Sequence, residues 1–481
     1  MASLHPEKDG KVITDSIHGD IHLTDLEIRV IDTASFQRLR SLKQLAMAHT
    51  VYPTATHTRF SHSVGALGMT IKIIERAREN KVSVTEDLEE VLRLAALLHD
   101  VGHYPYSHLM ERTDRVKLTE EEVEGGPPVP KAIDVQRVKY PEHEEIGKLI
   151  VTSQQDLIDV LGGKTKAEEV ADTFTRAITA DPQLSKFIHS SFDIDRCDYL
   201  LRDSYATGVP YGHIDINYLL NNVRVSPEKV VGFSAKALSA IEHFLLARFF
   251  MHKVVYYHKT TYALEEACRQ LLRRLRDKDD NPYNIPVDGE AIKDLVRSKR
   301  LHTFTDAFVD NIVQEAAKDS DTVISALAKA IQKRQPPKLL KEVPVYEESK
   351  QKYHPGRTFY QNCVNRLAQL AKEFGHPLGL FLLCESPVSI IKPPQQHRVS
   401  EMSSLSSTGI QTEIHKEEGE DIKIFREGEQ EPISLFDIPY SIVTKHSDYS
   451  FQWFRLYVVW EEDRDSDGIE KLREKVKDWD K

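Results

Sequence analysis

Features that mark several common protein classes are scarce or missing in this sequence. Only four of its 481 residues are cysteines, Cys197, Cys268, Cys363 and Cys384, and no two of them form a Cys-x-x-Cys pair. This spacing argues against a disulfide framework and against a thiolate zinc site. No run of about 18 apolar residues occurs, and the N-terminus has no apolar signal core. The sequence therefore predicts a soluble, cytoplasmic protein without a membrane-spanning segment.

A basic excess is also missing. The chain carries 64 Lys and Arg against 75 Asp and Glu, which gives a formal net charge of -11. A protein that coats nucleic acid presents a basic surface, so this balance argues against nucleic acid as a partner, while a local basic pocket for a phosphorylated small molecule stays compatible with it. With 40% hydrophobic residues, a chain of this length can bury a large core and divide into two or more domains.

An apolar run over residues 91–98 ends at the adjacent pair His99-Asp100. Polar or ionised groups beside apolar packing are costly unless they have partners. Imidazole nitrogen and carboxylate oxygen are both ligands of divalent transition metals. Because two neighbouring ligands cannot complete a coordination sphere, the pair predicts a metal site whose other ligands come from distant parts of the chain.

Two distant segments can supply these ligands. His62 opens a helical pattern, and four Asp residues fall between positions 193 and 203 among apolar residues. If the second segment is helical, Asp195, Tyr199 and Asp203 share one face. A solvated acidic face is the alternative, but the interleaved apolar residues give this helix a buried side. The predicted metal ligands are His62, His99, Asp100 and Asp195, which suffice for one or two divalent ions.

Further histidines lie close to the His-Asp pair in the sequence. His103 and His108 follow it, and His143 stands among carboxylates at 142–145. A lone histidine is most often a capped or surface residue. Several of them near one metal site favour acid–base chemistry, because imidazole exchanges its proton near neutral pH. These spacings alone indicate metal-assisted hydrolysis of a phosphoester or phosphoanhydride.

The predicted fold class is mainly α, with a helical core and a smaller α/β lobe at the C-terminus. Strand-like segments open the chain, and prolines with β-rich runs follow residue 340. We expect a catalytic core with a regulatory N-terminal segment at 1–340, a C-terminal lobe at 341–481, and loops at 118–140 and 393–421. Helices are expected at 24–35, 36–45, 62–78, 86–99, 143–152, 167–177, 192–203 and 235–274, and strands at 379–384, 388–391, 422–425 and 454–460.

An ordered series of motifs resembles the HD superfamily of metal-dependent phosphohydrolases. Within it, the closest likeness is to deoxynucleoside triphosphate triphosphohydrolases of the sterile-alpha-motif-and-HD-domain branch, and it is dense over residues 10–265. No sterile alpha motif is expected, since the chain starts at the catalytic core. The motifs are FQRLRSLKQL at 36–45, YPxAxHxRFxHS at 52–63, HDVGHxPxSH at 99–108, HE at 143–144, DRxDYxxRD at 195–203 and HxxxYxHK at 252–259.

The resemblance implies an HD-domain helical core that hydrolyses a deoxynucleoside triphosphate (dNTP) to deoxynucleoside and inorganic triphosphate. It implies a divalent cation on the four ligands above, with iron, manganese, magnesium and nickel all compatible. His143 becomes the candidate acid for the 5′-oxygen, and Tyr256 would reject ribonucleotides at the 2′ position. The implied catalytic residues are His103, His108, His143 and Asp203.

The resemblance also implies a set of substrate contacts. Arg196 stands where the family has Lys, which keeps the positive charge but changes the geometry of a phosphate contact. Gln44, Tyr199 and Asp203 would bind the sugar 3′-hydroxyl. The implied substrate-binding residues are Gln44, Leu45, Arg59, Arg196, Tyr199, Asp203, Arg248, His252 and Tyr256.

A second set of matches concerns regulation by a nucleotide such as GTP or a dNTP. Asp32 and Gln37 would face a guanine edge, and Lys11 and Arg40 would hold phosphates. The alternative is that Asp32 caps a helix and Arg40 is a surface ion-pair partner. The resemblance implies a nucleotide-dependent homo-oligomer, with a tetramer favoured. The implied effector residues are Lys11, Val12, Asp15, Asp32, Gln37, Arg40 and Lys259.

Two other functions stay open at this stage. The same site could belong to another HD phosphohydrolase, such as a nucleotidase, a phosphodiesterase, an alarmone hydrolase or a single-strand exonuclease. The chain could also be a nucleotide-sensing partner protein with a vestigial site, although every expected ligand is present. A dNTP triphosphohydrolase could serve either the control of dNTP pools or defence against phage.

Overall fold

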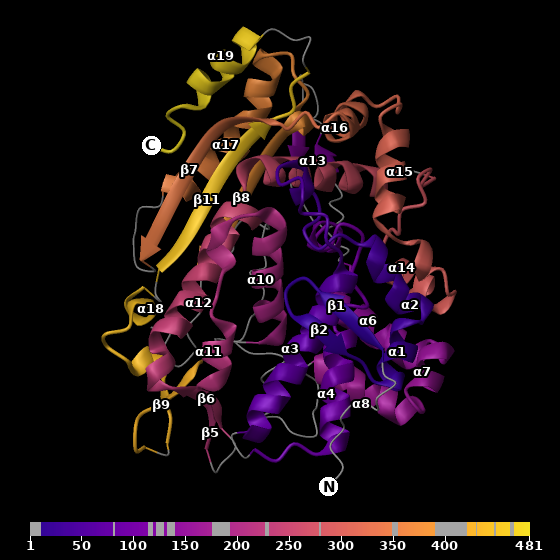
Figure 1. The fold of residues 1–481 in the computed structure, drawn as a ribbon. Coiled ribbons are helices and arrows are strands. Elements are labelled where there is room, and N and C mark those ends of the chain that lie inside the picture. The colour runs from indigo at the N-terminus through magenta and orange to yellow at the C-terminus, as the bar shows by residue number, and fades with distance from the viewer. Residues whose placement is uncertain are drawn as a thin grey trace.

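The structure is a computed structural model, and Figure 1 shows a helical body with a three-stranded sheet at one end. Among the described residues, no helix combines the length and the apolar character that crossing a bilayer requires. All four cysteines are buried. The described residues are 11–79, 82–113, 119–121, 129–131, 140–175, 193–226, 230–278, 280–348, 355–389, 421–429, 431–446, 449–461 and 466–481.

An antiparallel hairpin opens the described chain, formed by β1 (Val12–Asp15) and β2 (Gly19–His22). Ile21 of this hairpin is buried in the core at 3% exposure, and Ile13 packs against the same core while partly buried. Helix α1 (Asp25–Ile31) follows and begins at a capping box, in which Thr24 and Glu27 satisfy each other's backbone N–H groups. The hairpin is therefore anchored from one side by Ile21 and from the other by a well-capped helix.

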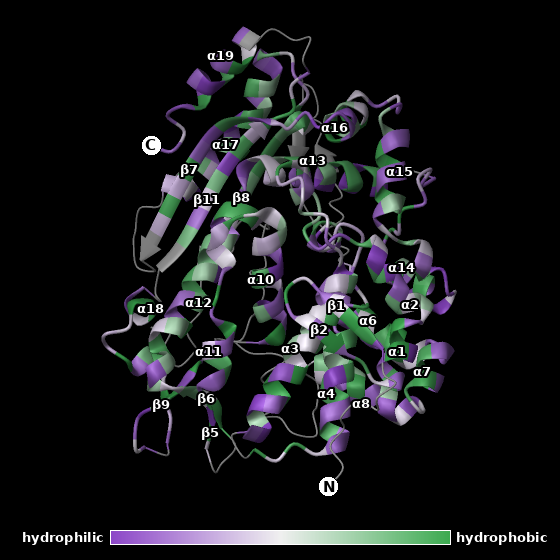
Figure 2. Cartoon of the chain, in the orientation of Figure 1, coloured by the Kyte–Doolittle hydropathy of each residue, from purple (hydrophilic) through white to green (hydrophobic). Residues whose placement is uncertain are grey.

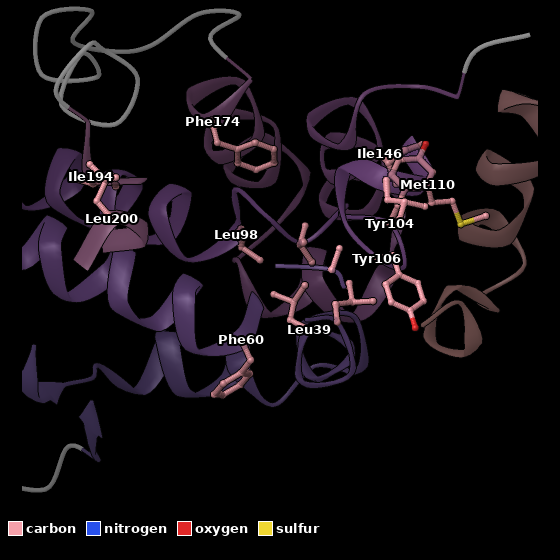
Figure 3. Packing of buried hydrophobic residues seen from close by; sticks show 14 of the residues in the cluster. Leu39, Phe60, Leu98, Tyr104, Tyr106, Met110, Ile146, Phe174, Ile194 and Leu200 are labelled. Atoms are coloured by element: carbon pink, nitrogen blue, oxygen red, sulfur yellow. The ribbon is translucent and has the colours of Figure 1, made fainter. Parts of the chain in front are cut away.

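The helical body forms around two central helices, α3 (Arg59–Glu79) and α4 (Glu86–Leu98), which lie against each other. All of residues 91–98 are buried, because α4 is also covered by α8 (Lys164–Phe174). Figure 3 shows part of this core, with Leu98, Phe174 and Phe60 among its side chains. The other helices of the body are α2 (Ala34–Gln37), α5 (His108–Glu111), α6 (His143–Ser153), α7 (Gln155–Val160), α10 (Ile194–Thr207), α11 (Ile216–Asn221), α12 (Leu238–Met251), α13 (Lys259–Arg276), α14 (Gly289–Arg297), α15 (Asp306–Ala316) and α16 (Thr322–Gln332).

The C-terminal sheet has the strand order β7-β11-β8 and is antiparallel throughout, with β7 (Lys338–Glu348), β11 (Tyr449–Val458) and β8 (Phe381–Ser389). Pro344 lies in β7, which is an edge strand and pairs with β11 alone among the described strands. Proline has no N–H to donate to a neighbouring strand, and an edge strand tolerates this because one of its sides has no neighbour. Helices α17 (Pro355–Glu373) and α19 (Ser466–Val476) contact the sheet, and with it they bury a second, smaller core. Figure 2 shows α19 with hydrophilic residues along its length, while Leu472 and Val476 are buried.

A small mixed sheet joins residues 421–434 of the C-terminal part of the chain to the helical body. Its order is β10-β9-β6-β5, and β9 runs parallel to β6. Ile424 and Leu435 belong to the main core and are fully buried. Residues 421–446 therefore contribute to the helical body, although they follow the first two strands of the C-terminal sheet. The strands are β5 (Val223–Val225), β6 (Val231–Ser234), β9 (Lys423–Phe425) and β10 (Ile433–Ser434).

The predicted fold class is confirmed, and the long helix predicted over 235–274 is wrong. Helix α12 ends at Met251, and residues 252–256 form a wider π-type turn. The His258 side chain then accepts a hydrogen bond from the Thr260 backbone N–H, so a new helix, α13, begins at Lys259. This break carries the predicted residues His252 and Tyr256.

The continuous helix predicted over 36–45 is also wrong. Helix α2 ends at Gln37, and a short 3-10 turn over Arg38–Ser41 follows it. The buried Arg38 guanidinium causes this change, because it donates hydrogen bonds to the backbone oxygens of Phe304, Val101 and His103. The strand predicted at 388–391 reaches only Ser389 in the described residues. Within the loop predicted at 118–140, β3 (Thr119–Glu121) pairs with β4 (Val129–Lys131). The rest of that loop except Tyr140, and the loop predicted at 393–421 except Asp421, lie outside the described residues.

Candidate active site

The four predicted metal ligands converge at the contact between α3, α4 and α10. His62 comes from the first turn of α3, His99 and Asp100 follow the last turn of α4, and Asp195 comes from the first turn of α10. The His62 Nε2 atom lies 2.9 Å from Asp195 Oδ1 and 3.6 Å from Asp100 Oδ2. The His99 Nε2 atom lies 3.3 Å from His62 Nε2 and 3.4 Å from Asp100 Oδ1.

The hydrogen bonds of both imidazoles suit a divalent cation. The Nδ1–H of His62 donates to Asp198 Oδ2 at 2.7 Å, and the Nδ1–H of His99 donates to the Ala96 carbonyl oxygen at 2.7 Å. Because a carboxylate and a carbonyl can only accept, each Nε2 atom is left to face the cluster of carboxylates. This is the arrangement in which an outer partner orients a metal-binding histidine. His62, His99 and Asp100 together can hold a metal ion, with Asp195 adjacent to them.

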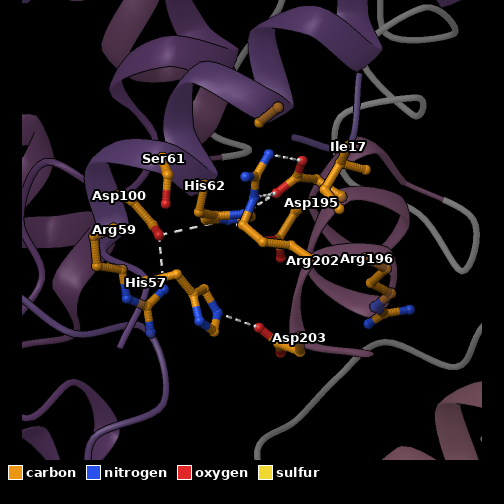
Figure 4. Close-up of polar contacts among 12 residues, drawn as sticks. Ile17, His57, Arg59, Ser61, His62, Asp100, Asp195, Arg196, Arg202 and Asp203 are labelled. Atoms are coloured by element: carbon orange, nitrogen blue, oxygen red, sulfur yellow. Dashed lines mark hydrogen bonds and ion pairs between the residues drawn. The ribbon is translucent and has the colours of Figure 1, made fainter. Parts of the chain in front are cut away.

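Burial and the charges of neighbouring groups shift the pKa values of His62 and Asp100 in this cluster. Burial lowers the pKa of His62, but hydrogen bonds to Asp195 and Asp198 outweigh that effect and raise it to about 10. Burial raises the pKa of Asp100, but the Arg59 guanidinium and the neighbouring histidines hold it below its ordinary value. Arg59 Nη1 donates to Asp100 Oδ2 at 2.7 Å, and Figure 4 shows Arg59 and His62 on either side of this carboxylate. A cation at this point would therefore meet ionised carboxylates.

A second histidine cluster lies beside the first. The His103 and His143 rings stack with centroids 3.9 Å apart, and the His108 ring lies edge-on to both. Glu111, which the sequence reasoning missed, holds two of them. Its Oε2 atom accepts from His108 Nδ1 at 2.6 Å, and its Oε1 atom accepts from His143 Nδ1 at 2.8 Å. The i, i+3 spacing of His108 and Glu111 on a helix was the available signal.

These contacts give the His143 ring a different protonation state from the His103 ring. Burial lowers the pKa of His103 well below its ordinary value, and the nearby positive charges of Arg59 and His143 lower it further. Burial also lowers the pKa of His143, but the carboxylates of Glu111 and Glu144 outweigh it and raise the pKa to about 9. At neutral pH, His143 thus carries a proton that it can donate, while His103 is neutral.

A third group of polar side chains lies where α10 meets the turn between α12 and α13. The Asp203 carboxylate accepts from His57 Nε2 at 2.7 Å on one oxygen and from the Tyr256 hydroxyl at 2.8 Å on the other. The Tyr199 and Tyr256 rings lie edge to face, 6.2 Å apart. The predicted shared face of α10 is thus present in the structure, and Figure 4 shows His57 directed at Asp203. His57 lay in a quoted motif, but the sequence reasoning gave it no role.

The other predicted substrate residues differ in their burial and in their contacts. The Gln44 backbone N–H donates to the His57 carbonyl oxygen at 3.0 Å, while Leu45 is partly buried against the core. Arg196 Nε lies 3.8 Å from Asp193 Oδ2, and Arg248 is buried. The His252 ring lies edge-on to Tyr256 at 4.8 Å. Ten buried side-chain atoms of the described residues lack a hydrogen-bond partner, and three of them belong to these site residues, as expected where a polar ligand binds: Gln44 Oε1, His57 Nδ1 and His103 Nδ1.

The predicted effector residues lie at three separate places in the structure. Lys11 and Val12 lie exposed at the start of the hairpin, whereas both carboxylate oxygens of Asp15 accept from Arg202. Gln37 donates to the Ile31 carbonyl oxygen and accepts from Arg40 Nε, close to the exposed Asp32 that ends α1. The Arg40 guanidinium also stacks 3.4 Å above the Phe60 ring.

Lys259, the remaining effector residue, lines a separate cavity of about 430 Å³ at the border with the C-terminal sheet, together with Lys338, Lys341 and Arg473.

Comparison with known proteins agrees with this architecture. The HD domain profile matches residues 59–202, which contain all four converging ligands, and the profile of the HD-associated region matches residues 214–335. The two matches together span just over half of the chain. The chain therefore belongs to the HD-domain family and carries the region associated with it.

Relatives and solved structures fit the same family. An uncharacterized protein of Methanocaldococcus jannaschii is 34% identical over 56% of this chain and 51% of its own length. A Dictyostelium discoideum homologue of the deoxynucleoside triphosphate triphosphohydrolase SAMHD1 is 31% identical over 54% of this chain and 48% of its own length. The chain thus spans about half the length of these curated relatives. A crystal structure of a hypothetical Aquifex aeolicus protein has the same fold, with 23% identity, a TM-score of 0.67, and coverage of 98% of this chain and 100% of that one.

Proposed function

We propose that this protein is a metal-dependent phosphohydrolase that converts a dNTP and water into a deoxynucleoside and inorganic triphosphate. The observation that carries the proposal is the adjacency of three groups: the His62–His99–Asp100 ligand cluster, the Glu111-bound histidines, and the Asp203–Tyr256 pair. These groups suit a cation, a chain of phosphates and a sugar, respectively. The Dictyostelium homologue named as a dNTP triphosphohydrolase supports the same substrate class.

The proposed chemistry assigns a task to each group. A divalent cation on His62, His99, Asp100 and Asp195 would supply Lewis acidity for the activation of water and of the α-phosphate. Arg59 lies beside this site and offsets phosphate charge. The water oxygen bonds to the α-phosphorus and the bond to the 5′-oxygen breaks. His143, protonated at neutral pH, gives its proton to that oxygen.

Substrate selection would follow from the third group. Asp203 is held on both oxygens, so it presents a fixed acceptor to the sugar hydroxyl, and the Tyr256 ring closes the side where a 2′-hydroxyl would lie. We further propose that a nucleotide effector binds near Asp32, Gln37 and Arg40 and that the active form is a homo-oligomer. Arg40 contacts Phe60, which lies next to Arg59 and two residues before the ligand His62, and this contact supports a link between the proposed effector site and the metal site.

A substrate panel tests the proposal. The purified chain is loaded with Mn²⁺, Fe²⁺, Mg²⁺ or Ni²⁺ and incubated with each dNTP and each ribonucleotide, with and without GTP, and the products are separated. Deoxynucleoside and triphosphate are expected from dNTPs only. The Asp195→Asn variant should lose activity by at least about a hundredfold, while Asp280→Asn, on an exposed turn with the positive φ that Asn tolerates, should retain it.

Other outcomes identify the alternatives. Release of orthophosphate, pyrophosphate or nucleoside monophosphate would instead indicate a different phosphohydrolase of the same family. The absence of any nucleoside from every dNTP, with every metal and effector, would contradict the proposal. Binding of dNTP without turnover, unchanged by Asp195→Asn, would favour a nucleotide-sensing protein.

A further inference from the structure

The turn between β1 and β2 reaches the metal site through a chain of buried hydrogen bonds. Asp15 Oδ1 accepts from the backbone N–H groups of Ile17 and His18, at 2.9 Å each, and so shapes the turn. Both Asp15 oxygens also accept from the Arg202 guanidinium, at 2.9 and 3.1 Å. The side chain of Asp15 is therefore committed to the protein interior and not to solvent.

His18 extends from this turn to Asp198. Its Nε2 atom lies 2.7 Å from Asp198 Oδ1, with the two side chains 1% and 0% exposed. Its Nδ1 atom lies 3.4 Å from the Lys72 ammonium, which can only donate a hydrogen bond. Hence Nδ1 accepts and Nε2–H donates to Asp198. A residue of the N-terminal hairpin thus donates to one oxygen of a fully buried carboxylate on α10.

Asp198 is the outer partner of the metal ligand His62. Its Oδ2 atom accepts from His62 Nδ1 at 2.7 Å, and Arg202 donates to both of its oxygens at 2.8 Å. The carboxylate therefore receives four donors, one of which comes from the hairpin. Any rotation of Asp198 that followed the loss of His18 would change the direction in which His62 Nε2 points.

Two glycines of α3 allow Asp198 and the hairpin to lie close to the backbone of this helix. A Cβ atom at Gly65 would lie 2.0 Å from Asp198 Oδ1, and one at Gly68 would lie 2.8 Å from the Ile21 side chain of β2. Two glycines one turn apart thus admit Asp198 and the hairpin to the same face of the helix that carries His62. This is an observation independent of the hydrogen bonds, and it points to the same arrangement.

We propose that the β1–β2 turn is a positioning element of the metal site, in which His18, held by Asp15, fixes Asp198 and thereby the orientation of His62. This inference rests on the metal site of the proposed function but not on the identity of the substrate. His18 is a positioning residue, because it touches neither a ligand of the cation nor the proposed substrate. It follows that the affinity for a divalent cation depends on the docking of the hairpin.

Titration with Co²⁺, followed by its visible absorption, tests the inference on the full chain. Loss of an outer-shell partner costs roughly 10- to 100-fold in metal affinity, and His18→Leu should raise the Kd about tenfold because it acts through Asp198. His18→Gln keeps an N–H donor and should stay within about threefold of the parent. Thr14→Val is the matched control, since the Thr14 hydroxyl donates to Asp20 on the exposed face of the hairpin. It should leave the Kd and the Co²⁺ spectrum unchanged.

The outcomes separate this inference from the proposed function. Equal Co²⁺ affinities of the parent and a folded His18→Leu overturn the inference alone, and a loss shared by Thr14→Val shows general loosening of the hairpin and also overturns it. If His18→Leu does not fold, Asp15→Asn replaces it, with weaker Co²⁺ binding expected and parental binding contradicting the inference. Co²⁺ binding without dNTP hydrolysis contradicts only the proposed substrate. A parent that binds no Co²⁺ overturns both the metal site and its positioning by His18.

Discussion

The buried Glu111 carboxylate accepts hydrogen bonds from two histidines, His108 and His143. Each of its oxygens accepts from a different imidazole, and the His143 backbone N–H also donates to it at 2.8 Å. Because both imidazoles use Nδ1 for Glu111, their Nε2 atoms are left for a ligand. The same charge decides that His143 is protonated at neutral pH, so a residue that touches no proposed substrate sets the supply of the proton.

A pH profile tests this role. Burial lowers the pKa of His143, and the charges of Glu111 and Glu144 raise it from 6.5 to about 9. The proton is present below that pH and is lost as the pH rises through it. The alkaline side of kcat/KM, which reports the free enzyme, should therefore fall with a midpoint near 9.

Replacement of the carboxylate should move this midpoint. Glu111→Gln removes the negative charge, so the alkaline midpoint should shift to lower pH, toward the ordinary value of 6.5. Glu144→Gln is the matched control, since Glu144 lies 3.3 Å from His143 and is 42% exposed, and its charge is better screened. Its shift should be smaller. An alkaline midpoint that is the same in the parent and in Glu111→Gln would show that His143 is not the acid.

At the scale of elements, the turn that follows α4 is held against the first turn of α6. A Cβ atom on Gly102 would lie 2.1 Å from the His143 carbonyl oxygen and 2.3 Å from the Gly147 backbone nitrogen. This contact between backbones fixes the distance from the His99-Asp100 pair to His143, and so from the cation ligands to the proposed acid. A glycine in the HDVGH motif is therefore a geometric requirement of the site.

Substitution of this glycine should damage both stability and activity. Gly102→Ala forces the two backbones apart, and overpacking of this kind costs about 1–3 kcal/mol. Denaturant unfolding should show that loss, and kcat should fall because His143 is displaced. Gly147→Ala is the control, as its Cβ would meet the Phe174 ring at 3.3 Å and the Gly102 backbone nitrogen only at an ordinary contact distance of 3.6 Å, and alanine favours the helix. Parental stability and kcat in Gly102→Ala would refute the requirement.

The parts of the site that followed from the sequence are those with a strict residue type and spacing. His99-Asp100 ends a buried helix as predicted, and the distant His62 and Asp195 lie beside it. Asp198 was overlooked because helical spacing shows which residues share a face but not which carboxylate meets an imidazole. Glu111 was missed for a related reason, since its partner His143 lies 32 residues later.

Elements were predicted less well where tertiary contacts override local preference. The edge position of β7 tolerates Pro344, so a proline that reads as a strand breaker sits inside a strand. The turn over 252–256 interrupts an apolar pattern that is continuous in the sequence, because the His258 cap starts a new helix. Both features depend on neighbours that no local pattern specifies.

At the scale of the whole molecule, the proposed cation joins three helices that are far apart in the sequence. His62, His99 and Asp195 come from α3, the end of α4 and α10, and these helices form the centre of the body. The Asp100 and Asp198 carboxylates and the Arg59 and Arg202 guanidinium groups are buried together, which is costly for charges without partners, while the Asp195 side chain stays 40% exposed. A bound cation therefore acts on the stability of the body as well as on the reaction.

Metal binding should consequently raise the resistance of the chain to unfolding. A ligand that binds only the folded state at a hundred times its Kd stabilises that state by about 2.7 kcal/mol. The midpoint of urea unfolding, followed by circular dichroism, should thus rise when Mn²⁺ or Co²⁺ is added after chelation. Asp195→Asn should lose most of this gain, and Asp280→Asn should keep it.

A second cluster of ligands makes this measurement more informative. The nitrogens of His103, His108 and His143 also lie close enough to hold a metal ion. If the cation binds there instead, His108→Gln abolishes the stabilisation and Asp195→Asn leaves it intact. The expected result is the reverse, because the first cluster adds the carboxylates of Asp100 and Asp195 to its imidazoles, whereas both oxygens of Glu111 already accept from His108 and His143. Hard and borderline divalent cations favour sites that include carboxylate oxygens, so we expect the stabilising cation at His62, His99, Asp100 and Asp195.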